Sequence, residues 1–246
     1  MLTEIIKMKN FLLLIAILSI LILVTPASAA DTFEETLKNA ESGDAASQGL
    51  LGTMYVLGNG GAPKDYEKAF EWFEKSALQG NDTAQFGLGM MYYDGIGVPQ
   101  DYKKAFEWLE KAALQGVEEA QYSLGLMYYE GIGVPQDYIN AYVYFNLAAT
   151  SNHNKAFLIR NQIQKIMNLD QIEKAQGISQ ELFKKIVNNK KFSADAIEEA
   201  IKKAESGDVK AQYELGLTYH GGIGVPQNYK KAIEWYEKAA LQGHSV

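Results

Sequence analysis

The sequence predicts an all-α protein, an α-solenoid of antiparallel helix-turn-helix repeats of about 36 residues each. Three observations support this fold class: a recurring period, apolar residues at helical spacing within each period, and glycines that divide each period in two. The period is visible in the rare residues of the 246-residue chain, since all three tryptophans and four of the five prolines occupy equivalent places. These places are Pro63, Pro99, Pro135 and Pro226, and Trp72, Trp108 and Trp235.

Residues 84–116 form one complete unit, and its first half predicts a helix. Ala84, Leu88 and Met91 recur at the spacing that places side chains on one face of a helix. Gly95 and Gly97 follow and end this helix, because glycine weakens helices and accepts left-handed backbone.

The second half of the unit predicts a second helix. Asp101 is a suitable N-cap, since a carboxylate accepts hydrogen bonds from the free amides of the first turn. Gly116 ends the helix with a residue that can adopt left-handed backbone. The predicted buried stripe of this helix consists of Tyr102, Ala105, Phe106 and Leu109.

Four units of this kind are present. One further helix precedes the first unit, and another precedes the fourth. A single helix pair cannot bury its apolar face, so neighbouring units must stack. Segments 33–44 and 197–208 each end in Ser-Gly-Asp and are predicted lead helices, the first with a capping box formed by Thr32 and Glu35. The four units are residues 47–80, 84–116, 120–149 and 211–243.

The segment between the third and fourth units, about residues 152–191, predicts an extra helical hairpin rather than a flexible linker. Its helices are expected at 160–167 and 170–185, with Asn168 and Gln171 as a capping box for the second. The expected domains are a first array at 31–151, an inserted hairpin at 152–192, and a lead helix plus fourth repeat at 193–246 with an open C-terminal end.

Residues 1–30 predict a secretion signal. An apolar run from Phe11 to Val24 follows Lys7 and Lys9 and precedes small residues suited to signal-peptidase cleavage. The alternative is a retained membrane anchor, but the run is shorter than the roughly 20 residues that span a bilayer. The sequence leaves two starts open, Met1 and Met8. A cleaved leader implies an exported protein, either periplasmic or secreted.

The motif over residues 84–116 resembles the Sel-one-like repeat (SLR), a relative of the tetratricopeptide repeat. It reads Ala-Gln-x-x-Leu-Gly-x-Met-Tyr-x-x-Gly-x-Gly-Val-Pro-x-Asp-Tyr-x-Lys-Ala-x-x-Trp-x-x-Lys-Ala-Ala-x-Gln-Gly, and it recurs four times with small variations. Members of that family are generally adaptors that hold other proteins, and many bacterial members are exported. The resemblance therefore implies an adaptor. A cysteine-rich branch of that family has been linked to cell-wall and β-lactam compounds, whereas this chain has no cysteine.

The composition argues against several kinds of chemistry. Without cysteine there is no disulfide, no thiolate zinc ligand and no thiol catalysis. A net charge of −7 argues against nucleic acid as the main partner. His153, His220 and His244 lie in separate segments without acidic residues at metal spacing. The Gly-x-Gly loops join two helices, so they are backbone turns rather than phosphate loops. We therefore expect no catalytic residue, no metal site and no cofactor.

A second apolar stripe on the first helix of each unit is the candidate partner-binding groove. In tetratricopeptide-like solenoids the corresponding face lines the concave surface, and the resemblance implies the same here. The alternative is that some of these side chains pack against the adjacent repeat. The stripe consists of Phe86, Met90 and Tyr93, then Tyr122, Leu126 and Tyr129, then Tyr213, Leu217 and His220.

The expected function is an exported protein–protein interaction scaffold without catalytic activity. Its partner is expected to be a protein, with no nucleic acid and no stable membrane insertion after cleavage. Self-association through the C-terminal repeat is a further expectation, because Ala232, Trp235, Tyr236 or Ala239 would be uncovered if no helix follows. The alternatives are a cell-wall or β-lactam-directed hydrolase, a periplasmic regulator that binds a membrane sensor, and a host-directed effector. The basic run at Lys184, Lys185, Lys190 and Lys191 could attract an acidic partner or a membrane surface.

Overall fold

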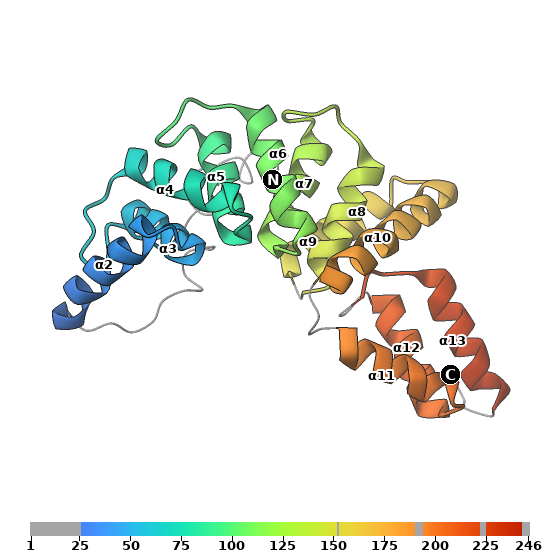
Figure 1. The fold of residues 1–246 in the computed structure, drawn as a ribbon. Helices are drawn as coiled ribbons and strands as arrows, with labels where there is room; N and C mark the ends of the chain where they lie inside the picture. The colour runs from blue at the N-terminus through green and yellow to red at the C-terminus, as the bar shows by residue number, and fades with distance from the viewer. Residues whose placement is uncertain (1–25, 152, 190–193, 222–224, 243–246) are drawn as a thin grey trace. The chain divides into compact units, whose positions relative to one another are not determined.

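All regular secondary structure in the described part of the chain is α-helical (Figure 1). The computed structural model describes residues 26–151, 153–189, 194–221 and 225–242, and within these ranges it contains twelve α-helices and no strand. The predicted fold class is confirmed. The helices are α2 Pro26–Glu41, α3 Ala45–Leu57, α4 Tyr66–Leu78, α5 Asp82–Asp94, α6 Tyr102–Leu114, α7 Glu118–Glu130, α8 Tyr138–Ala149, α9 Asn154–Gln164, α10 Leu169–Asn189, α11 Ala194–Glu205, α12 Val209–Gly221 and α13 Tyr229–Leu241.

Each predicted repeat is an antiparallel helix pair: α3 with α4, α5 with α6, α7 with α8, and α12 with α13. Helices α2 and α11 are the lead helices, and α9 and α10 occupy the segment between the third and fourth repeats. The chain divides into two compact units, one ending at Ala113 and the other beginning at Leu114. Helices α2 to α6 therefore belong to the first unit, apart from the last residue of α6, and α7 to α13 belong to the second.

The capping residues of the second repeat behave as the sequence predicts. Gly95 ends α5 with a φ of 68°, in the left-handed region, and its N–H donates to the carbonyl of Met91. Asp101 caps α6, because its Oδ1 accepts from the backbone N–H of Lys104 at 3.0 Å. Gly116 after α6 also has a positive φ, 83°. These local interactions make the connection between the two helices of a repeat rigid.

Glycines in the first helix of a repeat allow an aromatic ring of the second helix to approach closely. A Cβ placed on Gly125 in α7 would lie 2.8 Å from the ring of Phe145 in α8, and one on Gly52 in α3 would lie 2.7 Å from the ring of Phe73 in α4. Real Cβ atoms do not come this close, so the repeat requires glycine at this place. The ring of Phe145 is fully buried as a result.

The segment between the third and fourth repeats contains two helices, α9 and α10, and α9 begins and ends earlier than the predicted helix at 160–167. The predicted capping box is also confirmed: the N–H of Gln171 donates to Asn168 Oδ1 at 2.9 Å, and the N–H of Asn168 donates to Gln171 Oε1 at 3.0 Å. Both α9 and α10 pack against α8, which also packs against its own partner α7. Helix α8 is consequently buried on all sides from Ala141 to Ala149.

Two sequence predictions concern the N-terminal part of the chain. The capping box of Thr32 and Glu35 is wrong for this structure, because α2 begins at Pro26 and Thr32 lies within it. Proline suits the first position of a helix, and the alanines that follow are strong helix formers. The predicted leader falls mostly on residues 1–25, outside the described residues.

The expectation that α13 leaves its apolar face uncovered is wrong for three of its four residues. Ala232, Trp235 and Ala239 are 2%, 8% and 0% exposed, and only Tyr236 is half-buried. Ala232 and Trp235 pack into a core formed with α11 and α12. The ammonium of Lys238 also lies 3.9 Å from the centre of the Trp235 ring and covers it.

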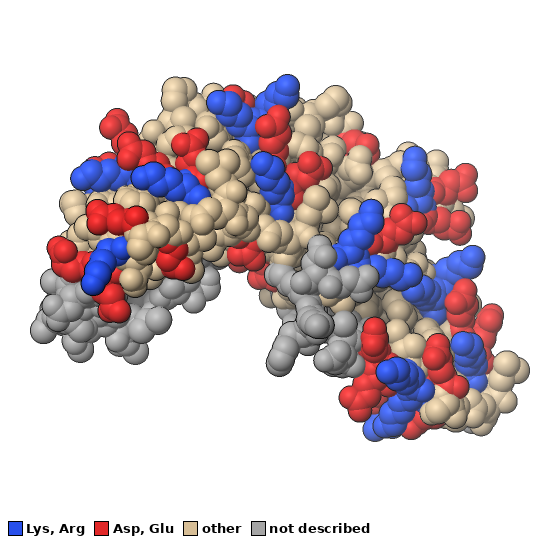
Figure 2. Space-filling model, viewed as in Figure 1, with Lys and Arg blue, Asp and Glu red and all other residues tan. Residues whose placement is uncertain are grey.

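Among the described residues, none of the helices combines the length and the apolar character needed to cross a membrane. On the face shown in Figure 2, acidic and basic side chains are interspersed over most of the surface.

The glycine close approach yields a matched pair of substitutions. Gly125→Ala should destabilise the protein by about 1–3 kcal/mol, because the added methyl group displaces the Phe145 ring. Gly177→Ala in α10, where a Cβ meets nothing within 4 Å, should stabilise it by about 0.5–1 kcal/mol through helix propensity alone. Urea unfolding of the two variants measures both effects. Equal effects would show that the α7–α8 contact does not require glycine.

Candidate functional site: paired rings at the loop edge of the repeats

Three repeats present a pair of aromatic rings on the two sides of the loop that joins their helices. The ring near the end of the first helix contacts the ring at the first position of the second helix. The centroid distances are 5.3 Å for Tyr93 and Tyr102, 5.7 Å for Tyr129 and Tyr138, and 5.6 Å for His220 and Tyr229. Tyr102 and Tyr138 are 36% and 38% exposed, so part of each pair reaches solvent.

The loop itself fixes the geometry of each ring pair. A glutamine that follows the loop proline donates through Nε2 to the carbonyl of the first ring residue: Gln100 to Tyr93 at 2.8 Å, Gln136 to Tyr129 at 2.7 Å and Gln227 to His220 at 2.7 Å. The capping residue after that glutamine donates its N–H to the carbonyl of the residue just before the first ring residue. Asp101 donates in this way to Tyr92 at 2.9 Å. Side chains on such a rigid support lose little freedom when a partner binds.

The first repeat has no such ring pair. Val56 occupies the place of Tyr93, and it is only 4% exposed. Lys64 stands where the other repeats have glutamine, and its ammonium lies 5.0 Å from the centre of the Tyr66 ring. The candidate site is therefore confined to the second, third and fourth repeats.

The predicted groove residues divide into three groups by burial. Phe86, Met90 and Tyr122 are 3%, 2% and 2% exposed, so their side chains belong to the packed interior. Leu217, at 48%, and His220 are exposed. The remaining residues are half-buried, namely Tyr93, Leu126, Tyr129 and Tyr213. Phe86, Met90 and Tyr122 therefore agree with the alternative that some residues of the stripe pack inside the protein.

Tyr122 shows why a stripe residue becomes buried. Its ring stacks on His153, with centroids 4.4 Å apart, and lies 5.7 Å from the ring of Phe145. Burial raises the pKa of the Tyr122 hydroxyl to about 12, and the nearby charge of Glu130 adds to this. The equivalent residue of the second repeat, Phe86, is buried too, so this position is interior in both repeats.

His153 is a structural residue. Its Nδ1 accepts from the N–H of Ala156 at 3.1 Å and caps α9. Burial lowers the pKa of His153, and the charge of Glu119 opposes that shift. The His153 side chain is half-buried.

The second ring of each pair is the part of the site that sequence reasoning missed. Tyr102 was predicted to lie in the buried stripe of its helix, yet it is 36% exposed and faces Tyr93. The recurrence of tyrosine directly after the capping residue, at Tyr66, Tyr102, Tyr138 and Tyr229, is a signal that could have identified it. The first helical position lies beside the loop, where no neighbouring turn covers it.

A buried amide pairing seats the loop of the fourth repeat on α8. Asn146 Oδ1 accepts from the backbone N–H of Gln227 at 3.0 Å, and Asn146 Nδ2 donates to the Gln227 carbonyl at 3.3 Å. The hydroxyl of Tyr142 donates to Gln227 Oε1 at 3.1 Å. Because Gln227 Nε2 also donates to the carbonyl of His220, this network positions the ring pair of the fourth repeat.

A fully buried arginine completes the network. Arg160 in α9 donates from Nη1 to Asn146 Oδ1 at 3.0 Å and from Nε and Nη2 to Asn161 Oδ1. Its guanidinium carbon lies 4.8 Å from the centre of the Phe157 ring. Among the described residues no carboxylate pairs with Arg160. Burial lowers the pKa of Arg160, while Tyr142 and Tyr229 oppose that change.

The sequence of α8 carries a sign of this arrangement. Asn146 stands where the previous repeat has Glu110, and Val143 stands where it has Glu107. Because glutamate is usually exposed, its replacement by uncharged residues at both positions indicates that this face of α8 is covered. The identity of the covering elements, α9, α10 and the loop before α13, does not follow from that exchange.

The ring pair of the fourth repeat, His220 and Tyr229, borders a hollow of about 470 Å³ between α9 and the loop of that repeat. Tyr229 and Gln164 share a hydrogen bond of 3.0 Å at its edge. The other lining residues include Phe157, Asn161, Lys165 and His220. Over the described residues, no group of three or more histidines and carboxylates could hold a metal ion, and His244 lies outside them.

A family model for the Sel1 repeat matches four segments of the chain, residues 45–81, 82–117, 118–153 and 209–244. The chain belongs to the Sel1 repeat family. The four matches coincide with the four helix pairs, and the segment that holds α9 to α11 lies almost wholly between the third and fourth matches. The resemblance found in the motif is thereby confirmed. Repeats of this type typically mediate protein interactions.

Three solved structures are similar to this Sel1 repeat chain. One, from uropathogenic Escherichia coli, is described as the protective antigen c5321 with an SLR fold; it is 30% identical, with 86% of this chain and 49% of that chain covered and a TM-score of 0.47. A Sel1 repeat protein from Oxalobacter formigenes is 28% identical, with coverages of 90% and 75% and a TM-score of 0.47. One from Klebsiella pneumoniae is 22% identical, with coverages of 86% and 93% and a TM-score of 0.41.

The matched region of this chain spans about half the length of the Escherichia coli protein. No curated protein matches the chain.

The amide pairing predicts a strong effect at one position of the third Sel1 repeat. Asn146→Leu should destabilise the protein by about 2–5 kcal/mol, because buried groups of Gln227 and Arg160 lose a partner at about 1–3 kcal/mol each. Hydrogen exchange in α12 and α13 should accelerate. Glu110→Leu is the control at the equivalent place in the second repeat, and it should change stability by less than about 0.5 kcal/mol. Unchanged exchange in α12 and α13 would contradict the seating role of Asn146.

Proposed function

We propose that this protein is an exported scaffold that binds other proteins and has no catalytic activity. The observation that carries the proposal is the ring pair, which recurs in three repeats at the same loop edge on the same rigid support. Repetition of one exposed feature suits an extended partner that is contacted at several points. Membership of the Sel1 repeat family supports the same class of function.

The chemistry of the rings suits protein binding. Tyrosine contributes a large apolar area with few rotatable bonds, and its hydroxyl can remain hydrated or join a hydrogen bond. Binding energy in protein interfaces is often concentrated on such residues. The half-buried positions of Tyr93 and Tyr129 hold each ring in place and still leave part of it accessible.

The proposed export is based on the leader-like composition of residues 1–30. Cleavage next to Ala30 would remove the first turn of α2, which begins at Pro26. The periplasm or the exterior is therefore the proposed location.

Substitution of the rings tests the scaffold. The double variant Tyr93→Ala, Tyr129→Ala should lose proteins that the wild type captures from envelope extracts, because truncation of a central aromatic residue commonly costs 2 kcal/mol or more, about 30-fold in affinity. Tyr66→Ala is the control, because Tyr66 has the place of the second ring, Tyr102 or Tyr138, in the repeat that has no ring pair. Circular dichroism must show that both variants remain folded. Capture of the same proteins by the double variant would place the binding surface elsewhere.

Mass spectrometry of the protein recovered from cells tests the export. The N-terminus is expected at Ala30 or Asp31, because the small residues before this point suit signal peptidase. Recovery of an intact leader in a membrane fraction would show that the segment is an anchor.

A further inference from the structure

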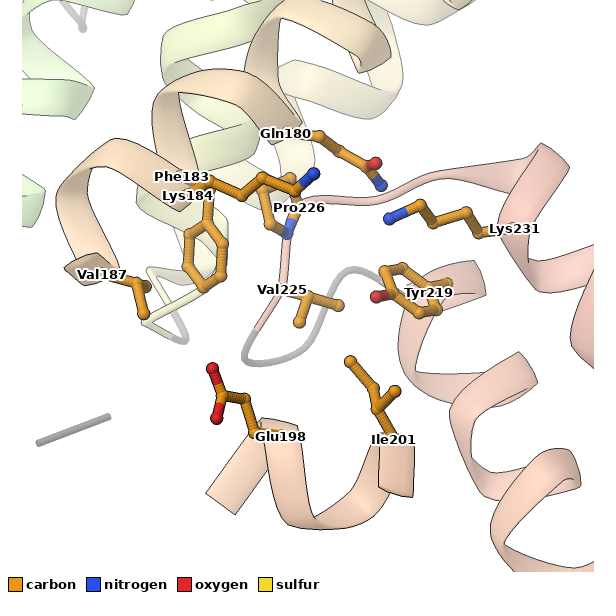
Figure 3. Close-up of a pocket in the computed structure, with 10 residues that line it drawn as sticks. All are labelled: Gln180, Phe183, Lys184, Val187, Glu198, Ile201, Tyr219, Val225, Pro226 and Lys231. Atoms are coloured by element: carbon orange, nitrogen blue, oxygen red, sulfur yellow. The ribbon is translucent and has the colours of Figure 1, made fainter. Parts of the chain in front are cut away.

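A second cavity, of about 220 Å³, lies between α10 and the fourth repeat (Figure 3). Residues from α10, α11, α12, α13 and the loop before α13 line it. Its apolar part is formed by Phe183, Val187, Ile201, Tyr219, Val225 and Pro226. Cavities that hold drug-sized ligands measure roughly 300–1,000 Å³, so this one suits a single amino-acid residue better than a whole cofactor.

Three nitrogen donors gather at one end of this cavity. In Figure 3 the ammonium groups of Lys184 and Lys231 and the side-chain amide of Gln180 point toward one another above the apolar part. The Nε2 atom of Gln180 is buried and has no hydrogen-bond partner among the described residues. A buried amide without a partner costs about 1–3 kcal/mol, so this group is poised for an acceptor that the chain does not supply.

The electrostatics at this end favour an anion. Burial lowers the pKa of Lys231, and the charge of Lys184 lowers it further, whereas Glu234 opposes the change. Lys184 and Lys185 in α10 and Lys230 in α13 are exposed. A bound carboxylate would relieve the repulsion between Lys184 and Lys231.

The lysine–tyrosine contact at this cavity also occurs in another repeat, whereas the groups from α10 do not. Lys231 lies 5.0 Å from the centre of the Tyr219 ring, as Lys104 does from Tyr92 at 5.1 Å, so this lysine–tyrosine contact is a general property of the repeat. Gln180, Phe183 and Lys184 come from α10, which has no counterpart in the regular repeats. The inserted helix therefore converts a common repeat feature into a cavity with a cluster of donors.

The opposite end of the cavity carries an acceptor. Figure 3 places the Glu198 carboxylate below the Phe183 ring, away from Lys184, Lys231 and Gln180. A peptide C-terminus has matching groups, because its carboxylate accepts hydrogen bonds, its last side chain is apolar in many proteins, and its backbone N–H donates. A fatty acid has no donor for Glu198, and its tail would exceed a cavity of this size.

We propose that this cavity binds the C-terminal residue of a partner polypeptide, with its carboxylate at Gln180, Lys184 and Lys231 and an apolar side chain against Phe183, Ile201 and Val225. The proposal rests on the protein-binding function proposed above and adds a second, chemically specific contact to the ring pairs. Glu198 accepts a backbone N–H of the residue that precedes it, because the N–H of the bound residue is attached to the same Cα as the carboxylate.

The test uses the full-length protein and the tripeptide acetyl-Gly-Gly-Leu with a free carboxylate. Methyl NMR signals of Ile201 and Val225 should shift in a saturable way at millimolar peptide. The same tripeptide with a C-terminal amide should bind at least about tenfold more weakly, because the charge-assisted hydrogen bonds to the carboxylate are lost. Octanoate should also bind at least about tenfold more weakly, because it has no N–H to donate to Glu198. Equal affinity for the amide, tighter binding of octanoate or no saturable shift would each overturn the proposal.

Three substitutions sharpen the test. Lys184→Gln and Lys231→Gln should each weaken binding of the free-carboxylate peptide several-fold, whereas Lys185→Gln, an exposed neighbour outside the cavity, should not. Gln180→Met should weaken binding and raise the melting temperature, because it removes the buried donor that has no partner. Unchanged binding in the lysine variants, or a lower melting temperature with unchanged binding in Gln180→Met, would contradict the assignment.

The pocket and the scaffold fail in different ways. If the tripeptide does not bind but loss of Tyr93 and Tyr129 still abolishes capture of proteins, the pocket proposal is wrong and the scaffold proposal stands. If the tripeptide binds as expected but the wild type captures no protein, the pocket assignment is right and the ring pairs are not a binding surface.

Discussion

The amide pairing between Asn146 and Gln227 is the interaction on which the second unit depends. It satisfies both backbone groups of a loop residue inside the protein, where an unpaired N–H or carbonyl would be costly. It also supplies an acceptor to the buried guanidinium of Arg160, which has no carboxylate partner among the described residues. The loop held in this way leads directly into α13. The His220–Tyr229 ring pair, the hollow beside it and the cavity against α10 all involve this loop.

The regular repeats and the inserted helices have different roles in this protein. The repeats supply a uniform support in which Gly95 or its equivalent ends one helix, a glutamine fixes the loop, and a capping residue begins the next helix. The inserted helix α10 makes one place unlike the rest, because it brings Gln180 and Lys184 to the fourth repeat. Specific recognition is therefore expected where the repeat pattern is interrupted, because identical repeats present identical surfaces.

Local features of this structure could be predicted from the sequence. The 36-residue period, the caps at Asp101 and Gly116 and the reciprocal capping box of Asn168 and Gln171 all agree with the prediction. Each depends on residues within a few positions of one another, so the physical cause lies within the segment itself. The exception, the predicted cap at Thr32, failed because the residues before it also favour a helix.

The sequence by itself therefore determined the fold class, the repeat boundaries and the helical character of the inserted segment. Only the tertiary structure decided which side chains are accessible. Phe86 and Tyr122 share a helical face with Tyr93 and Tyr129, but they are buried, while Tyr102 is exposed and Trp235 is covered by Lys238. The donor cluster of Gln180, Lys184 and Lys231 joins residues about 50 positions apart in the chain. Helical period specifies the direction of a side chain on its own helix, whereas burial depends on which distant segment packs against that face.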